Sequence, residues 1–257
     1  MMHLETVQIV LLVAAGLIVG FSKTGVPGTG ILMVPLMAWA LGGRLSLGAT
    51  VPMLVVGDCC AVAIYRAHAD WDHVKRLTPW VLLGLVFGTV FLLFVPHGVK
   101  RKDPLNLIIG SLVLAMLGVQ LLRKRLGDRL LPTSSGGAAA TGVLAGFSTM
   151  ASNAAGPIMS IYLTAAGLPK NIFMGTSAWY FFIFNLAKLP FLFLVTRADP
   201  AHPLFSASTL WIDLGLLPVI LFGALLGRWL LPLIPEKAFS NCVLVLAAVA
   251  AVVLVFK

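Results

Sequence analysis

Apolar runs separated by short polar or glycine-rich stretches fill the chain from residue 4 to residue 256. A helix needs about 20 apolar residues to cross a bilayer, and shorter apolar runs are typical of broken or re-entrant helices. By this measure the sequence predicts ten helical segments, at residues 4–22, 29–42, 46–66, 74–96, 104–123, 136–150, 155–168, 171–196, 208–232 and 238–256. We therefore expect an all-α polytopic membrane protein with eight to ten spans, the lower number applying if the glycine-rich segments are re-entrant.

The predicted segments form two sets of five, and residues of the first set recur in the second at fixed spacings. Gly20, Phe21, Ser22 and Gly30 recur 126 positions later as Gly146, Phe147, Ser148 and Gly156. Pro79, Gly84, Gly88 and Pro96 recur 139 positions later as Pro218, Gly223, Gly227 and Pro235. Such matches in one order indicate an internal duplication. Because five spans per copy is an odd number, the second copy is expected to insert in the opposite orientation, as an inverted repeat.

We expect a single transmembrane domain over residues 1–257, with repeat 1 at about 4–123 and repeat 2 at about 136–257. The composition excludes a soluble protein, since 60% of the residues are hydrophobic, 11% are charged and the mean hydropathy is +1.02. Soluble domains are roughly half apolar and a quarter charged. The net charge of +9 does not indicate a nucleic-acid partner, because the basic residues gather in short loops between apolar runs.

The basic loops predict an orientation in the membrane through the positive-inside rule. The loops expected in the cytoplasm carry Arg66, Lys75 and Arg76 after the third segment and Arg123, Lys124, Arg125 and Arg129 between the repeats. The loop at residues 197–203 has one arginine balanced by Asp199 and is expected outside. Residues 100–102 are all basic, but this topology places them on the outer side of the membrane, so they count against the predicted orientation.

A glycine-rich element interrupts the apolar pattern near the start of each repeat, at residues 20–35 and again at residues 146–160. Unwound backbone at membrane depth is tolerated where protein buries it or where it lines a cavity, and a helix N-terminus there favours an anion. We expect the two elements to converge on an oxyanion pocket. Its predicted substrate-binding residues are Ser22, Lys23, Thr24, Gly28, Thr29, Gly30, Ser148, Thr149, Ser152, Asn153 and Gly156. The alternative is that the glycines only pack helices closely and that Lys23 snorkels to the interface.

Three further polar residues, Asp58, Asn185 and Lys188, lie inside apolar runs, where ionisable groups are costly and are functional candidates. Asp58 is a candidate proton carrier, or it neutralises a lysine. Asn185 is expected at a similar depth to Asp58, because it corresponds to Cys59 at the 126-residue spacing. Asn185 and Lys188 are added to the predicted substrate site, although Lys188 has snorkelling as an equal alternative.

The loop at residues 67–73 holds His68, Asp70, Asp72 and His73, which suggests a metal site. We favour a solvated loop with Trp71 at the membrane interface, because no regular helical spacing organises those side chains. The three cysteines form no metal-binding spacing either. The sequence therefore predicts neither a metal nor another cofactor.

The chain resembles the sulfite exporter TauE/SafE family over essentially its whole length. Four features carry this resemblance: the repeated Gly-Phe-Ser element, the pattern of Gly28, Gly30 and Pro35, the Ala69-Asp70-Trp71 loop and the PxxxxGxxxG element. The resemblance implies a permease of the bacterial inner membrane. Its substrates would be small sulfur-containing or carboxylic anions, such as sulfite or organosulfonates, usually exported and linked to the proton gradient. The chain departs from the pattern at Ile31, where the family often has glycine, and in its second copy, which keeps only Gly156 of the GxG.

We therefore expect the chain to be a secondary transporter, not an enzyme, which exports a small anion by alternating access. Its expected partners are the anionic substrate and the lipid bilayer, and a homo-oligomer is left open. Two alternatives remain. One is a cation transporter or channel that uses Asp58. The other is a membrane enzyme or assembly factor that transports nothing.

Overall fold

The computed structural model describes residues 4–26, 28–94 and 135–230, together with positions 111, 114, 115, 118 and 252. Every regular element within residues 4–26, 28–94 and 135–230 is a helix. The helices are α1 (Thr6–Thr24), η1 (Thr29–Leu32), α2 (Met33–Leu41), α3 (Gly43–Tyr65), η2 (Arg66–His68), α4 (Trp71–Phe94), α6 (Ser135–Ser152), α7 (Gly156–Ala165), α8 (Lys170–Ala198) and α9 (Ala207–Leu230), where η denotes a 3-10 helix.

The prediction of an all-α membrane protein is confirmed for the described residues. Each predicted segment that falls in them corresponds to a helix whose ends lie within three residues of the predicted ones. Five of the described helices are long and apolar enough to cross a membrane: Thr6–Thr24, Gly43–His68, Trp71–Phe94, Lys170–Ala198 and Ala207–Leu230. The predicted segments 104–123 and 238–256, and the basic residues 100–102 and 123–129, lie outside the described residues except for the single positions given above.

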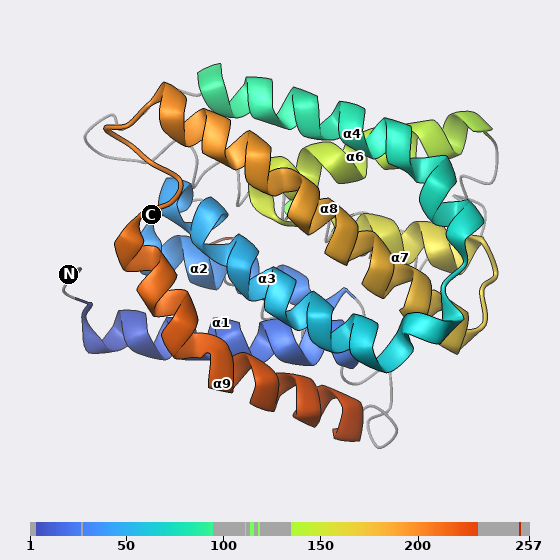
Figure 1. The fold of residues 1–257 in the computed structure, drawn as a ribbon, viewed down its shortest axis with the longest axis horizontal. Helices are drawn as coiled ribbons and strands as arrows, with labels where there is room; N and C mark the ends of the chain where they lie inside the picture. The colour runs from blue at the N-terminus through green and yellow to red at the C-terminus, as the bar shows by residue number, and fades with distance from the viewer. Residues whose placement is uncertain are drawn as a thin grey trace.

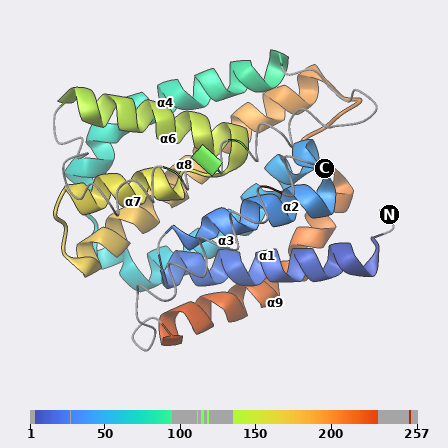
Figure 2. The same cartoon turned by 180° about the vertical axis from the view of Figure 1, so that it is seen from behind.

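The long helices are arranged as two outer pairs with a central pair between them (Figure 1). Helices α1 and α9 form one outer pair, and α4 and α6 form the other. Helices α3 and α8 cross the space between these pairs side by side and in opposite directions (Figure 1). The short helices α2 and α7 lie in the same central region when the molecule is seen from behind (Figure 2).

The two outer pairs are built on glycines at corresponding positions. In the first pair, a Cβ atom added to Gly20 would lie 2.0 Å from the carbonyl oxygen of Ile220. In the second pair, a Cβ atom added to Gly146 would lie 2.2 Å from the carbonyl oxygen of Val81. The two glycines are 126 positions apart, and the two carbonyl residues are 139 positions apart. Both backbones therefore approach at the same register, as small residues allow in membrane helices.

The partner helices contribute glycines that make the reciprocal contacts. A Cβ atom on Gly223 would lie 2.4 Å from the carbonyl oxygen of Leu17, and one on Gly84 would lie 2.3 Å from that of Val143. These pairs again follow the 139-residue and 126-residue spacings. In each outer pair, a helix that begins one predicted repeat therefore packs against the fourth predicted segment of the other repeat.

The outward faces of the outer pairs are apolar, as a bilayer requires. Phe87 and Phe94 on α4 are 51% and 81% exposed, and Leu225 and Trp229 on α9 are each 67% exposed. Lipid tails provide an apolar solvent for such side chains, so the buried polar groups must find their partners inside the bundle.

Substitution of Gly223 by alanine is expected to lower stability, because the new methyl group would overlap the backbone of α1. Overpacking of this kind costs about 1–3 kcal/mol. Gly215→Ala is the matched control in the same helix, since a Cβ atom there would meet no atom within 4 Å. Thermal unfolding in detergent should show a lower midpoint for Gly223→Ala only. Equal midpoints for the two variants would mean that the close approach of α1 and α9 is not required.

Candidate functional site

Both predicted helix breaks are present in the structure. Helix α1 ends at Thr24, and the chain turns through Gly28, whose φ is +89°, before η1 begins. Helix α6 ends at Ser152, and the next residue, Asn153, has a φ of +56°. Left-handed backbone is open to glycine at little cost and to asparagine more readily than to most residues. These two residues therefore permit the chain to leave one helix and start another within a few residues.

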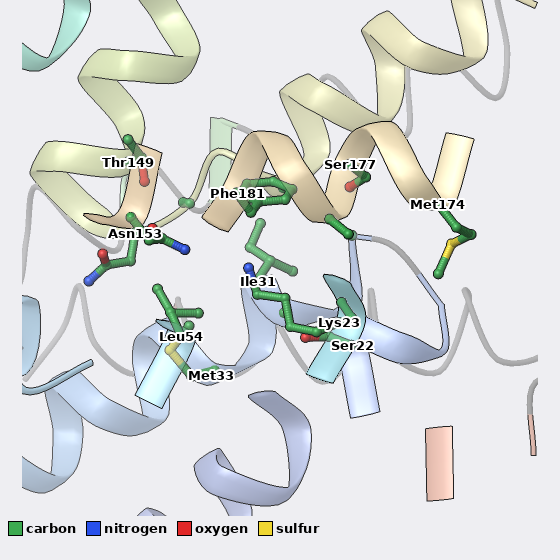
Figure 3. A pocket seen from close by; sticks show the side chains of 17 residues that line it. Ser22, Lys23, Ile31, Met33, Leu54, Thr149, Asn153, Met174, Ser177 and Phe181 are labelled. Carbon is green, nitrogen blue, oxygen red and sulfur yellow. The ribbon is translucent and has the colours of Figure 1, made fainter. Parts of the chain in front are cut away.

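The two breaks lie next to each other, as the sequence analysis expected. A Cβ atom added to Gly156, the first residue of α7, would lie 3.7 Å from the Cα atom of Gly28. A cavity of about 60 Å³ opens beside this contact (Figure 3). The cavity is lined by Ser22, Lys23, Gly28, Gly30, Ile31, Met33, Leu54, Ala61, Thr149, Asn153, Ala154, Gly156, Met174, Ser177, Ala178, Phe181 and Asn185.

Lys23 brings a positive charge to the wall of the cavity. Its Nζ atom forms an ion pair with Asp58 Oδ1 of α3 at 2.7 Å and lies 4.2 Å from the centre of the Phe181 ring. Its side chain is 12% exposed, whereas that of Asp58 is fully buried. Lys23 therefore does not snorkel to the interface: it reaches across the helix break to a buried carboxylate, and the aromatic face of Phe181 provides a further favourable contact for the cation.

Asp58 also joins the two central helices. Asn185 on α8 donates a hydrogen bond of 2.6 Å from Nδ2 to Asp58 Oδ2. The expectation that these residues lie at a similar depth is therefore confirmed by direct contact. Because the other carboxylate oxygen is paired with Lys23, the single side chain of Asp58 ties α1, α3 and α8 together.

Lys188 takes a position that neither alternative of the sequence analysis described. It is fully buried, so it does not snorkel, and it is not among the residues that line the cavity. Its Nζ atom donates to Asn153 Oδ1 at 2.7 Å and to Thr149 Oγ1 at 3.1 Å, with a longer contact of 3.4 Å to the Thr149 carbonyl oxygen. Lys188 thus stands behind the cavity and holds the second helix break in place.

The break in α6 is also fixed from the opposite side. Asn153 Nδ2 donates to the carbonyl oxygen of Leu47, near the start of α3, at 3.2 Å. With its Oδ1 atom bonded to Lys188, the amide group of Asn153 connects α3, α8 and the second break. These contacts hold Asn153 in the left-handed conformation that asparagine tolerates better than most residues.

The ionisable residues of this region are two lysines, Lys23 and Lys188, and one aspartate, Asp58. In their usual charge states they leave one positive charge beside the cavity. Buried charge is costly in a membrane unless it is paired, so such a site favours a ligand that carries negative charge.

Four of the predicted substrate-binding hydroxyl groups do not line the cavity, although they are close in the sequence to residues that do. They belong to Thr24, Thr29, Ser148 and Ser152. Thr24 donates to the carbonyl oxygen of Ala224 on α9 at 2.7 Å, and Thr29 donates to that of Val26 at 2.8 Å. Ser152 donates to the carbonyl oxygen of Ser148 at 2.9 Å, and both serines are buried. These side chains satisfy backbone groups at the breaks and along the interface with α9.

Four lining residues of α8 were not predicted as part of the site: Met174, Ser177, Ala178 and Phe181. Met174, Ser177 and Phe181 lie along the cavity in Figure 3. Asp213 on α9 was not predicted as a candidate either; it is 6% exposed, and its carboxylate oxygens have no hydrogen-bond partner among the described residues. The signal for Asp213 was available, because an aspartate within an apolar run is rare. It does not line the cavity.

The polar loop that precedes α4 has a structural role. Asp70 Oδ1 accepts hydrogen bonds from the backbone N–H groups of Asp72 and His73, which is the pattern of a helix N-cap. Trp71 packs on Trp179 with ring centres 5.2 Å apart. In the described residues, no group of three or more His, Cys, Asp or Glu side chains is placed to hold a metal ion.

Comparison with protein families matches residues 12–254 to the family described as "Sulfite exporter TauE/SafE". No curated protein and no solved structure matches the chain. The family match extends over nearly the whole length and includes both helix breaks and both central helices. Together with the apolar spanning helices, it makes the chain a multi-pass membrane protein of a transporter family. The chain belongs to the sulfite exporter TauE/SafE family.

Proposed function

We propose that this protein is a secondary transporter that exports a small oxyanion, such as sulfite, across the bacterial inner membrane, coupled to protons and by alternating access. The observation that carries the proposal is the cavity between the two helix breaks, which is lined by Lys23 and has Asp58 and Lys188 behind its walls. The anion would contact Lys23 directly, with the hydroxyl group of Thr149 and the amides of Asn153 and Asn185 as hydrogen-bond donors. The hydroxyl group of Ser22 also lines the cavity, but it donates to the carbonyl oxygen of Val19 at 3.0 Å. The family match supports the transport of an anion of this kind.

The size of the cavity favours a compact substrate. One water molecule needs about 10–15 Å³ of such volume, so a cavity of about 60 Å³ has room for a few water-sized groups. Sulfite, with four non-hydrogen atoms, is a ligand of this size. A longer organosulfonate would need the walls to move, and the lining includes two flexible methionine side chains, Met33 and Met174, that can change conformation.

An inverted repeat within a single domain agrees with the arrangement of the helices. The reciprocal glycine contacts follow two constant spacings, and the corresponding central helices α3 and α8 run in opposite directions (Figure 1). Transporters built in this way bind substrate near the midplane, between discontinuous helices, and rock one bundle against the other.

The lining of the cavity indicates the side from which it is reached in this conformation. Along α8 it extends from Asn185, near the middle of the helix, to Met174, about one turn from the helix start. That end of the bundle carries Arg66, which the positive-inside rule assigns to the cytoplasm. Asn153 lines the cavity next to the second break, and Lys188 binds Asn153 from behind it. We therefore assign this conformation to the inward-facing state.

The alternative of a cation transporter is disfavoured by the same contacts. Asp58, the carboxylate on which it depends, is fully buried and already paired with Lys23. A cation bound there would have to displace an ammonium group held at 2.7 Å. A membrane enzyme or assembly factor would show no flux in proteoliposomes that contain only this protein.

Lys23→Ala is expected to lower sulfite affinity and sulfite flux in proteoliposomes by tenfold or more, because truncation of a buried charged contact costs about 2–5 kcal/mol. Lys75→Ala removes an exposed lysine of α4 and is the matched control. The double variant Lys23→Met with Asp58→Asn removes both charges of the pair, which avoids leaving an unpaired buried carboxylate. Unchanged flux in the folded Lys23 variants would contradict the anion site.

Two substitutions of Asn153 should separate backbone geometry from side-chain contacts. Asn153→Gly keeps the left-handed turn and removes the amide that binds Lys188, so we expect a folded protein with weaker sulfite binding. Asn153→Ala also strains the backbone, which costs about 1–2 kcal/mol, so its unfolding midpoint should be lower still. Isothermal titration and thermal unfolding measure the two effects. If both variants bind sulfite as the wild type does, the second break is not part of the site.

A further inference from the structure

The ammonium group of Lys23 lies between an internal carboxylate and the cavity. Behind it is Asp58, fully buried on α3, and in front of it is the cavity that Lys23 lines. An ammonium group has three N–H donors. One side of this group is taken by the ion pair with Asp58 and another lies against the ring of Phe181, which leaves the remaining side directed to the cavity (Figure 3).

Asp58 is surrounded by polar and ionisable groups from α1, α3 and α8. Lys23 faces it from α1, Asn185 and the more distant Lys188 face it from α8, and Cys59 and Cys60 follow it on α3. Helices α2 and α6 carry no Asp, Glu, Lys, Arg, His, Cys or Tyr residue. Helix α9, which also packs against α3, has Asp213 near its start and Arg228 near its end, and η2 at the end of α3 carries Arg66 and His68. The charge state of Asp58 therefore depends on its complete burial and on its partners on α1 and α8.

We propose that the Asp58 carboxylate and the transported anion compete for Lys23, so that the anion binds together with a proton on Asp58. This inference rests on the proposed function. It adds that binding of the anion and binding of a proton to Asp58 favour each other. An anion beside Lys23 places a second negative charge next to the buried carboxylate and draws on the same ammonium group. Protonation of Asp58 removes both the competition and the repulsion. The protonated carboxyl group can still accept the hydrogen bond from Asn185.

Coupling of this kind is reciprocal: if a proton on Asp58 favours the anion, the anion favours the proton to the same degree. Proton and anion then cross the membrane in the same direction. A dianion such as sulfite, moved with one proton, carries one net negative charge, which the inside-negative membrane potential drives outward. The competition for Lys23 is therefore compatible with export driven by the membrane potential. The proton gradient itself would drive the proton and the anion inward.

The test uses methanesulfonate, a compact sulfonate whose own charge does not change near neutral pH. Its affinity for the purified full-length protein would be measured by isothermal titration at a series of pH values. For the wild type we expect the affinity to fall as the pH rises, by up to about tenfold per pH unit, as one co-bound proton requires. An affinity that is constant, or that rises with pH, would overturn the proposal.

Asp58→Asn imitates the protonated carboxyl group and frees Lys23. This variant should bind methanesulfonate at least as tightly as the wild type does at low pH, with no pH dependence. Asp213→Asn is the matched control, since it changes another buried aspartate of a spanning helix outside the cavity, and it should keep the wild-type pH profile. Loss of binding in folded Asp58→Asn, pH dependence that survives in it, or loss of pH dependence in Asp213→Asn would each contradict the assignment.

One measurement needs only the wild type and decides the case if Asp58→Asn does not fold. Methanesulfonate added to the protein in weakly buffered solution should cause proton uptake, and the absence of uptake on binding would overturn the inference. Failure of the proposed function gives a different result, because the wild type would then bind neither methanesulfonate nor sulfite at any pH. Binding without proton uptake would leave the anion site standing and remove only the coupling.

Discussion

The central part of the molecule depends on the burial of one carboxylate. Asp58 is fully buried in a helix that spans the membrane, and an unpaired ion in such a place would cost several kcal/mol. Its two oxygens are paired with Lys23 of α1 and Asn185 of α8. These contacts hold the broken end of α1 against both central helices. The cavity lies there because the unwound backbone, the ion pair and the small residues at positions 28 and 156 must share the same region.

Two kinds of helix contact divide the structure into parts with different freedom to move. In the outer pairs, glycines bring backbones into contact along several turns, and such interfaces leave little room for sliding. In the centre, α3 and α8 are joined by the hydrogen bond between Asn185 and Asp58 and by the polar network at the breaks, and Gly175 is the glycine that brings the start of α8 against the backbone at the end of α3. A change of conformation that keeps α1 with α9 and α4 with α6 must therefore take place along the central helices and at Gly28 and Asn153.

Much of this arrangement could be predicted from the sequence, because apolar run length and repeated glycines follow directly from the demands of a bilayer. The positions of Lys23 and Asn153 in the breaks could be predicted for the same reason. Their partners could not, since helical spacing alone does not determine which face of α8 meets the breaks. Lys188 turned out to bind Thr149 and Asn153 from behind the cavity, and Thr24 turned to α9. Asp213 was overlooked although its isolation in an apolar run is visible in the sequence.

The ionisable residues of the site lie at positions where the two proposed repeats differ in sequence. At the 126-residue spacing, Lys23 corresponds to Thr149, Asp58 to Phe184 and Lys188 to Val62, so no ionisable residue of the site has an ionisable counterpart. The repeats supply two matching helix breaks and a common frame of glycine contacts. The first break has its lysine in the last turn of α1, where a carboxylate balances it, while the second break receives its lysine from α8. An anion bound between them would therefore meet two unequal halves, and the carboxylate of Asp58 belongs to one of them.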